Sequence, residues 1–347
     1  ILANVAQHPD AARFASMCAL VPSVTGLVVH AYPVDGDLPT LVDATDPNYM
    51  LAIFSEALAP AGLAVRQCHV EIGHYGRRDR CVLRYTIDLS DASGRTGTAV
   101  VYGKVYSDDT GELVARVVTA AGAFLARSQT DALVVPSHLT YISALRLSLL
   151  NRVPGSPVMA ATIRAACQGE ESTELPSVDS TIDDAARVAA SVHSWPISVG
   201  PVRTIGDDLS EHRRDLREMA TISPIFARYL TELLDEIEDA ATTTETQRLG
   251  FGHGDYSLAQ FLHHQSTVGL VDFDSACQAE PALDLGHFMA YLRMAVAKNQ
   301  TSEASGAALV EQLTSRFLVA YAQAYGLERL EPAIEDRARV YEAVSLM

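Results

Sequence analysis

The chain has 347 residues, of which 48% are hydrophobic and 20% charged, a globular composition that excludes a wholly disordered or low-complexity chain. Its 26 Lys and Arg against 43 Asp and Glu give a net charge of −17, which argues against a nucleic-acid partner, because sequence-independent binding needs a cationic surface. We expect a cytoplasmic protein without a membrane partner, since no signal peptide or membrane-length apolar run is visible and the five scattered cysteines contain no CxxC pair.

Residues 1–65 are predicted to form an N-terminal extension. Its expected elements are a helix around 10–20, strand-like pieces at 26–34 and 39–43, and a helix that ends near Leu58. Asp46 precedes Pro47 at the start of this last helix, a pairing typical of a helix N-terminus.

Residues 66–153 are predicted to form a β-rich N-lobe. Hydrophobic residues alternate from Cys81 to Leu89, which indicates a half-buried strand. A second strand at 98–106, an amphipathic helix at 111–127 and a strand pair within 132–150 complete an antiparallel sheet with one helix on it. The second strand carries Lys104, one of only two lysines beside 24 arginines, so a particular need for an ammonium group is indicated there.

Residues 154–347 are predicted to form a mostly helical C-lobe. A polar linker at 169–180 precedes the expected helices, which lie at 181–194, 208–220 and 223–240, with long helices resuming after 282. The third of these helices carries an unbroken i, i+3, i+4 apolar stripe at 225–237. One short β-rich island interrupts the helices at 252–273. The fold class is therefore α+β, with two lobes joined near residue 150.

The β-rich island contains His253-Gly254-Asp255, then Gln260 five residues after Asp255, then Val271-Asp272-Phe273-Asp274. The segment Glu280-Pro281-Ala282-Leu283-Asp284-Leu285 follows. In these motifs the chain resembles the aminoglycoside phosphotransferase and choline kinase family, relatives of the protein kinases, in which an Asn usually stands where this chain has Gln260. The resemblance covers roughly residues 66–347 and implies a two-lobed protein-kinase-like fold.

The resemblance implies an ATP- and Mg²⁺-dependent kinase that phosphorylates a hydroxyl of a small molecule. Phosphoryl transfer passes through a loose, highly charged transition state, so the protein mainly positions groups and neutralises charge. Asp255 is the candidate base for the acceptor hydroxyl, and His253 is expected to brace its loop. Asp272 and the Gln260 side-chain oxygen are the candidate Mg²⁺ ligands, since Mg²⁺ prefers oxygen. Asp274 is either a further ligand or a loop brace.

The nucleotide-binding candidates lie in the N-lobe and at its end. Lys104 is expected to hold the α- and β-phosphates, as the strand lysine does in kinase-like folds. Glu112 is either its ion-pair partner or an acid favoured by a helix N-terminus. Gly73 and Gly76 lie in a loop that either covers the phosphates or is a plain hairpin turn. Leu150 and Val153 mark the expected hinge for adenine.

The acceptor is less defined by the sequence. Residues 205–245 carry eleven acids and four Arg, which form either a pocket for a cationic acceptor or solvated helix faces. Gln260 also resembles the maltokinase and glucosamine-kinase branch, which favours a sugar or amino sugar. The main alternative is a catalytically silent kinase-like nucleotide-binding or interaction module. A protein kinase is disfavoured by the eight residues from Asp272 to Glu280, and a hydrolase by the lack of GxSxG and HExxH.

Overall fold

The computed structural model describes residues 32–347 except 77–79, 129–131 and 171–172. The helix predicted at 10–20 and most of the strand predicted at 26–34 lie outside these residues. The chain divides into two units, the first made of Ile1–Thr119 and Pro136–Arg152, the second of Ala120–Val135 and Val153–Met347. The division into 1–65, 66–153 and 154–347 stays a proposal.

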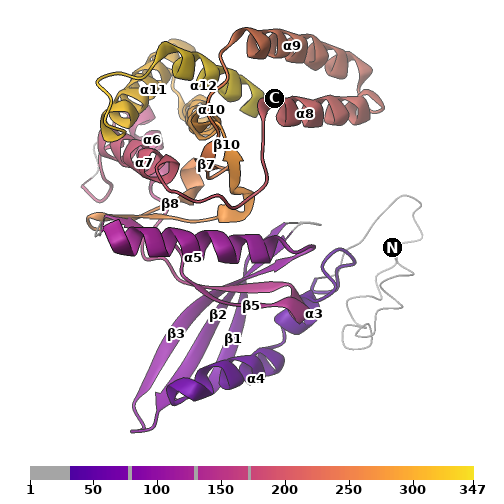
Figure 1. The fold of residues 1–347 in the computed structure, drawn as a ribbon, viewed down its shortest axis with the longest axis vertical. Helices are drawn as coiled ribbons and strands as arrows, with labels where there is room; N and C mark the ends of the chain where they lie inside the picture. Colours follow the sequence, from indigo (N-terminus) through magenta and orange to yellow (C-terminus); the bar gives the residue numbers. More distant parts are fainter. Residues whose placement is uncertain (1–31, 77–79, 129–131, 171–172) are drawn as a thin grey trace. The chain divides into compact units, whose positions relative to one another are not determined.

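The first unit is built on one antiparallel sheet in the order β1-β2-β3-β6-β5 (Figure 1). Its strands are β1 (Leu63–Gly76), β2 (Arg80–Asp91), β3 (Thr96–Tyr106), β5 (His138–Ile142) and β6 (Leu147–Asn151). The predicted alternation in β2 holds, because Cys81, Leu83 and Tyr85 are fully buried while the residues between them are half-buried. The alternating side chains thus form the core face of the sheet.

The helices of this region are α3 (Leu41–Ala44), α4 (Pro47–Leu58) and α5 (Thr110–Ser128), with short 3₁₀ turns η2 (Ala59–Ala61) and η3 (Ser143–Leu145). The Asp46 carboxylate accepts hydrogen bonds from the backbone N–H of Asn48 and Tyr49, which caps α4 as predicted. Met50 and Phe54 of α4 are buried in the core of the sheet, and the Phe54 ring meets Tyr85 edge-on at 5.3 Å.

The strand predicted at 39–43 is wrong, because these residues enter the one-turn helix α3. Leu41 and Val42 are both buried, whereas neighbouring residues of a strand point to opposite faces. A strand of the sheet holds α3 in place, since the Tyr85 hydroxyl of β2 donates to the Ala44 carbonyl at 2.8 Å. The described part of the predicted extension therefore belongs to the core of the first unit.

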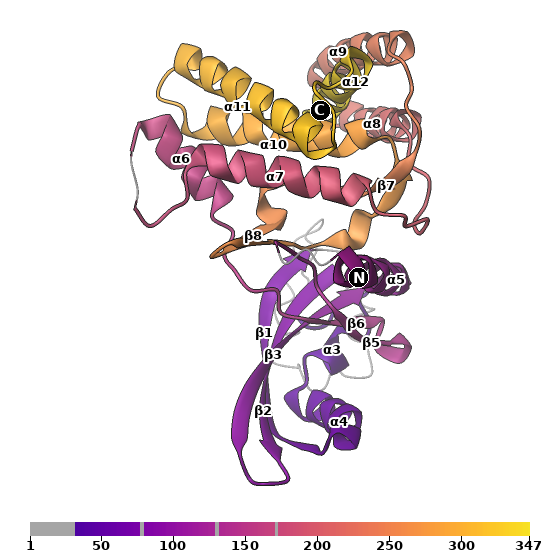
Figure 2. The same ribbon diagram turned by 60° about the vertical axis from the view of Figure 1, so that its left-hand side comes forward.

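The second unit is mainly helical, so the predicted α+β class with an antiparallel N-terminal sheet and a helical C-terminal part is confirmed. Its helices are α6 (Met159–Gln168), α7 (Val178–His193), α8 (Ile205–Ala220), α9 (Pro224–Thr243), α10 (Pro281–Asn299), α11 (Glu303–Ala324) and α12 (Pro332–Ser345). Helix α10 is packed by α6, α11 and α12 (Figure 2), and Phe288 of α10 stacks on Phe317 of α11 at 4.3 Å. A buried ion pair joins Arg337 of α12 to Glu280, which precedes α10.

Short strands and turns fill the second unit between these helices. They are β4 (Leu133–Val134), β7 (Gly250–Gly252), η4 (Leu258–Gln260), β8 (Phe261–His264), β9 (Thr267–Leu270), η5 (Phe273–Ser275) and β10 (Cys277–Ala279). Strands β8 and β9 form an antiparallel pair, and β7 pairs with β10. The motifs His253-Gly254-Asp255 and Val271-Asp272-Phe273-Asp274 lie on this framework.

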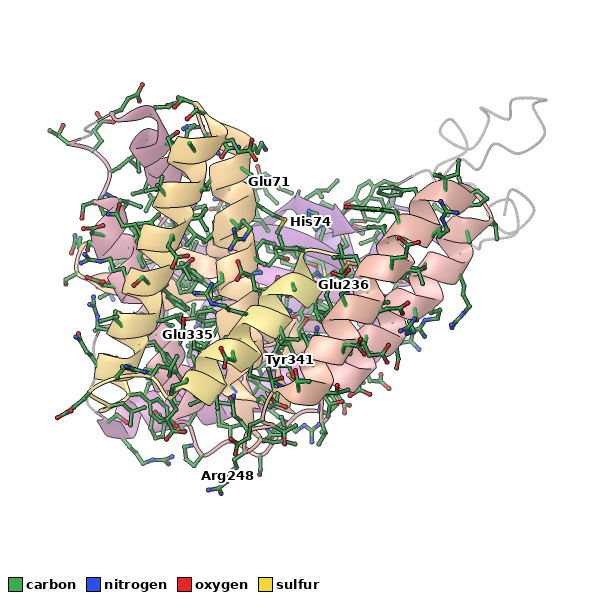
Figure 3. All side chains as sticks on the ribbon, turned by 90° about the horizontal axis from the view of Figure 1, so that it is seen from above. Glu71, His74, Glu236, Arg248, Glu335 and Tyr341 are labelled. Carbon is green, nitrogen blue, oxygen red and sulfur yellow. The ribbon has the colours of Figure 1, made fainter. Side chains whose placement is uncertain are left out.

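The apolar stripe of α9 is only partly buried. Leu234 and Ile237 are buried, but Ile225, Phe226 and Tyr229 are exposed, Ile225 by 80%. The helix is apolar on two sides, and its packing against α8 and α12 covers only one of them. Arg213 of α8 forms ion pairs with Asp235 and Glu238 of α9, and Figure 3 shows Glu236 on the same helix.

Two global features were also predicted from composition. Within the described residues, no helix combines the length and hydropathy needed to cross a bilayer. Four described cysteines are free thiols, Cys68, Cys81, Cys167 and Cys277. Burial raises the pKa of Cys68 to about 11 and those of Cys81 and Cys277 to about 12, so these three thiols stay protonated and weakly nucleophilic at neutral pH.

Candidate active site

The loop between β7 and η4 begins with His253, whose side chain is fully buried. Its Nε2 lies 3.0 Å from the Val271 carbonyl, which can only accept, so this nitrogen carries the proton. Its Nδ1 accepts from the backbone N–H of Asp255 at 3.4 Å. With both ring nitrogens engaged, His253 joins the loop to the residue before Asp272 and is not placed to take a proton from an acceptor.

Gly254 brings this loop close to η5. Its φ is +80°, and a Cβ at this position would lie 2.0 Å from the Ser275 carbonyl oxygen. Backbone cannot yield to such a contact, so only glycine fits between His253 and Asp255. Packing therefore requires the glycine between the two residues.

Asp284 of α10 anchors the same loop with a side chain that is 1% exposed. It accepts hydrogen bonds from the backbone N–H of His253 at 2.7 Å and of Gly254 at 2.8 Å. His193 Nε2 lies 3.1 Å from Asp284 Oδ2, the oxygen that also accepts from the His253 N–H. Burial alone would raise the pKa of Asp284, but the contact with His193 and the donors from the loop outweigh it and lower the pKa to about 2.

The Asp255 carboxylate is held by two neighbours. The Gln260 amide nitrogen donates to its Oδ2 at 3.0 Å. Burial, followed by the negative charge of Asp255 and a hydrogen bond to it, raises the pKa of Tyr291, so the Tyr291 hydroxyl keeps its proton and donates to Asp255. These contacts orient the carboxylate without a charged partner.

The candidate metal ligands were predicted to be Asp272, Gln260 and Asp274. The Gln260 amide nitrogen is engaged with Asp255, which leaves its carbonyl oxygen as the group for a cation. Asp272 follows β9 and has the left-handed backbone conformation, φ +69°, uncommon for a residue other than glycine. Asp274 lies in η5, two residues on.

This oxygen-donor set fits Mg²⁺, which is usually held by one or two carboxylates together with substrate phosphates. Among the described residues, no group of three or more His, Cys, Asp or Glu could hold a metal alone. The residues present therefore suit a cation that a nucleotide also ligates.

The nucleotide-binding candidates lie in the first unit, apart from Val153. Lys104 is 8% exposed in β3, where it pairs with Val82 of β2 and Ser148 of β6. Gly73 and Gly76 were expected in a loop, but both belong to β1, Gly73 at an irregularity in register and Gly76 opposite Arg80 at the hairpin end. Residues 77–79, between β1 and β2, lie outside the described part of the chain.

Glu112 is exposed in the first turn of α5. The pKa of Tyr141 is raised mainly by burial, then by the charge of Asp109 and then by that of Glu112. Leu150 is buried in β6 opposite Tyr102 and His138. Val153 begins the longer stretch of the second unit, immediately after the first unit ends. The expected hinge thus coincides with the point where the chain passes between units.

A cavity of about 350 Å³ opens beside Asp255 and is here named the acceptor cavity. Its lining residues are Arg203, Asp208, Glu211, His212, Asp215, Gly254, Asp255, Ser275, His287, Tyr291, Val344 and Ser345. Four of these are acids, and three of the acids come from α8 within the acidic stretch noted in the sequence. Three acidic residues of α8 therefore face a cavity rather than bulk solvent alone.

Arg203 links this cavity to the loop. Its Nε donates to Asp208 Oδ1 at 2.7 Å and its Nη1 to the Gly254 carbonyl at 2.9 Å. Asp208 is only 6% exposed, yet its Oδ2 has no hydrogen-bond partner among the described residues, and neither has His287 Nδ1. Burial, and then the charge of Arg203, lowers the pKa of His287, which is therefore neutral at pH 7.

Several of these residues were not predicted as parts of the site. Asp284 was noted only as part of a helix start, although an Asp inside an apolar run is itself a sign of a buried, bonded carboxylate. The others are His193 at the end of α7, Arg203 just before α8, and His287 and Tyr291 of α10, which left no pattern because tertiary packing brings them to the loop.

Comparisons with known proteins agree with this geometry. The profile of the phosphotransferase enzyme family matches residues 114–342. A choline kinase from Cryptosporidium parvum has the same fold at a TM-score of 0.51, with 10% identity over 86% of this chain and 85% of that one.

Two further solved structures are similar to this chain. An ethanolamine kinase from Plasmodium vivax has a TM-score of 0.49, with 11% identity over 86% of this chain and 87% of its own. An aminoglycoside phosphotransferase from Streptomyces rimosus has a TM-score of 0.47, with 18% identity over 85% and 97%. No curated protein matches the sequence.

Proposed function

Because the chain belongs to the phosphotransferase enzyme family, and is thus a small-molecule kinase, we propose that it transfers the γ-phosphoryl group of ATP to a hydroxyl of a small amine-bearing molecule such as an amino sugar. The observation that carries this proposal is the Asp255 carboxylate, held by Gln260 and Tyr291 at the wall of an acidic cavity.

Asp255 accepts the proton of the acceptor hydroxyl as its oxygen bonds to the γ-phosphorus and the bond to the β,γ-bridging oxygen breaks, which releases ADP. His253 and Asp284 hold the loop in place for this step. Bound Mg²⁺ neutralises phosphate charge, and Asp272, the Gln260 oxygen and Asp274 are the residues that would hold it. Lys104, partnered by Glu112, and the β1–β2 hairpin with Gly73 and Gly76 would bind the phosphates, with Leu150 and Val153 beside the adenine.

An N–H donor on the acceptor is supported by Asp208. A buried carboxylate oxygen without a partner is costly unless the ligand supplies a donor. A primary ammonium can do so, as can a hydroxyl other than the one phosphorylated, whereas choline has a quaternary ammonium without N–H and a single hydroxyl. The cavity therefore favours amino sugars, aminoglycosides or primary amino alcohols over choline-like acceptors.

The test is ATP consumption with aminoglycosides, amino sugars, maltose-type sugars, primary amino alcohols and choline. Asp255→Ala should lower kcat by roughly 10²–10⁴ while ATP affinity stays near wild type, because the base acts on the acceptor in the transition state. Asp239→Ala, an exposed acid on α9 outside the acceptor cavity, is the matched control.

Turnover of Asp255→Ala within about threefold of wild type would refute this role. Absence of ATP turnover in the wild-type protein with every acceptor class would favour the silent nucleotide-binding or interaction module. A preference for choline over primary amines would contradict the role of Asp208.

A further inference from the structure

The second unit contains another cavity, about twice as large as the acceptor cavity, with a volume of about 740 Å³. We name it the Trp195 cavity. Its wall is formed by residues 193 and 195–198 after α7, 245–251 up to β7, Gln278, Pro281, Tyr325, and 331, 333 and 334 at the start of α12. It shares no lining residue with the acceptor cavity, and its volume is typical of small-molecule sites.

Two residues that line this cavity each carry a buried polar atom without a partner among the described residues, Trp195 Nε1 and Gln247 Oε1. Trp195 is 3% exposed, and a buried indole N–H normally donates a hydrogen bond. The Gln247 amide nitrogen donates to the Ala333 carbonyl at 3.3 Å, which fixes which end of the amide is the acceptor. The wall thus offers one donor and one acceptor of known identity.

The rest of the wall defines the ligand further. Trp195 stacks on Phe251 at 5.7 Å, and Leu249, Pro281 and Ile334 add apolar surface. The charged residues of the wall are two exposed acids, Glu245 and Glu331, and Arg248, which extends outward in Figure 3. This charge balance disfavours an anion, and the aromatic surface favours a flat ring.

We propose that the Trp195 cavity is a second ligand site, which binds a neutral aromatic amide whose carbonyl accepts from Trp195 Nε1 and whose N–H donates to Gln247 Oε1. Such a molecule carries one partner for each of the two atoms and a ring for the aromatic wall. A dialkylated amide keeps the carbonyl but lacks the N–H.

The cavity also contacts the residues that support the catalytic loop. Trp195 stacks on Phe273, the residue after Asp272, at 6.2 Å. His193 lines the cavity and contacts Asp284, which accepts from the backbone N–H of His253 and Gly254. A ligand that orders this wall therefore also stabilises the anchor of the loop, and the site is an effector site.

Binding can be measured directly, because Trp195 is the single tryptophan of the chain. Benzamide should give a saturable change in Trp195 fluorescence and a matching heat in calorimetry. N,N-dimethylbenzamide should bind roughly fivefold more weakly, since one hydrogen bond is lost. Gln247→Leu should bring the two affinities within about twofold, while Gln312→Leu, an exposed glutamine on α11, should keep the preference.

The proposal is overturned if benzamide gives neither a fluorescence change nor heat, or if Gln247→Leu keeps the preference for benzamide. The link to the loop has its own readout, amide hydrogen exchange at His253 and Gly254, which saturating benzamide should slow at least about threefold. Unchanged exchange at both amides in the saturated protein would overturn the effector role. None of these measurements depends on phosphoryl transfer, so they stand apart from the test of the proposed function.

Discussion

Asp284 holds the backbone of the loop that carries Asp255. Its carboxylate is ionised although fully buried, because His193 and two backbone N–H groups bond to it. Since folding lowers its pKa from 3.8 to about 2, the ionised form stabilises the fold fully above pH 4. This contribution is lost as pH falls from about 4 to about 2.

The free energy of unfolding of the wild type should therefore lose roughly 2 kcal/mol from this group across that pH range. Asp284→Asn should be less stable at pH 7 and should lack this part of the acid dependence. Urea unfolding of both proteins at several pH values measures it, with the exposed Asp239→Asn as control. Identical pH slopes for Asp284→Asn and wild type below pH 4 would contradict the assignment.

Gln260 is the residue at which this chain departs from the pattern of the family it resembles. Its amide nitrogen is engaged with Asp255, so the carbonyl oxygen is the group left for Mg²⁺. Gln260→Ala should raise the Mg²⁺ concentration needed for half-maximal rate. For Gln260→Asn this concentration should lie between those of the wild type and Gln260→Ala, because the shorter side chain reaches less far toward the cation in a loop that fits Gln. A Mg²⁺ titration of rate on the three proteins decides this; superimposable curves would show that Gln260 is not a ligand.

The sequence singles out candidate residues where a motif lies in one short segment, and their roles stay proposals. His253, Asp255, Gln260 and Asp272 fall within twenty residues, and the structure brings their loop and hairpin together. Arg203 and His287 were not predictable, since each reaches the site from a helix or linker distant in the chain. Their positions follow from helix packing, which a local pattern does not contain.

At the scale of elements, α9 shows where a periodic pattern misleads. The spacing of its apolar residues predicts a helix correctly, but not which of its two apolar sides is covered. The short helix α3 shows a related failure, because tertiary burial of Leu41 and Val42 overrides the local preference for a strand. Cap residues such as Asp46 were more reliable, since capping depends only on near neighbours.

The two sides of α9 can be compared with one chemical change. Ile237→Ala removes a side chain that is 7% exposed and should cost about 2–4 kcal/mol in the free energy of unfolding. Ile225→Ala removes one that is 80% exposed and should change it by less than about 0.5 kcal/mol. Urea unfolding of the two variants measures both values. Similar losses would mean that a partner covers the exposed side of α9 in solution.

At the scale of the whole molecule, the plan of a β-rich part before a helical part was predictable, because the hydrophobic period changes from two to 3.6 along the chain. That Ala120–Val135 belongs to the second unit was not predictable from the sequence. It arises because β4 pairs in parallel with β9, a contact between segments more than a hundred residues apart. Long-range pairing of such short strands leaves almost no local pattern.

The scarcity of lysine has a practical consequence for proteolysis. Lys104 is buried in the middle of the sheet, and Lys298 is exposed near the end of α10. A lysine-specific protease should therefore cut the native chain first after Lys298, and after Lys104 only when β3 leaves its neighbours. The ratio of the two cleavage rates, followed by mass spectrometry, reports how often the first unit opens. Equal rates at both sites would mean that β3 is not held in the sheet, and slower cleavage after Lys104 with added ATP would mark nucleotide binding to that unit.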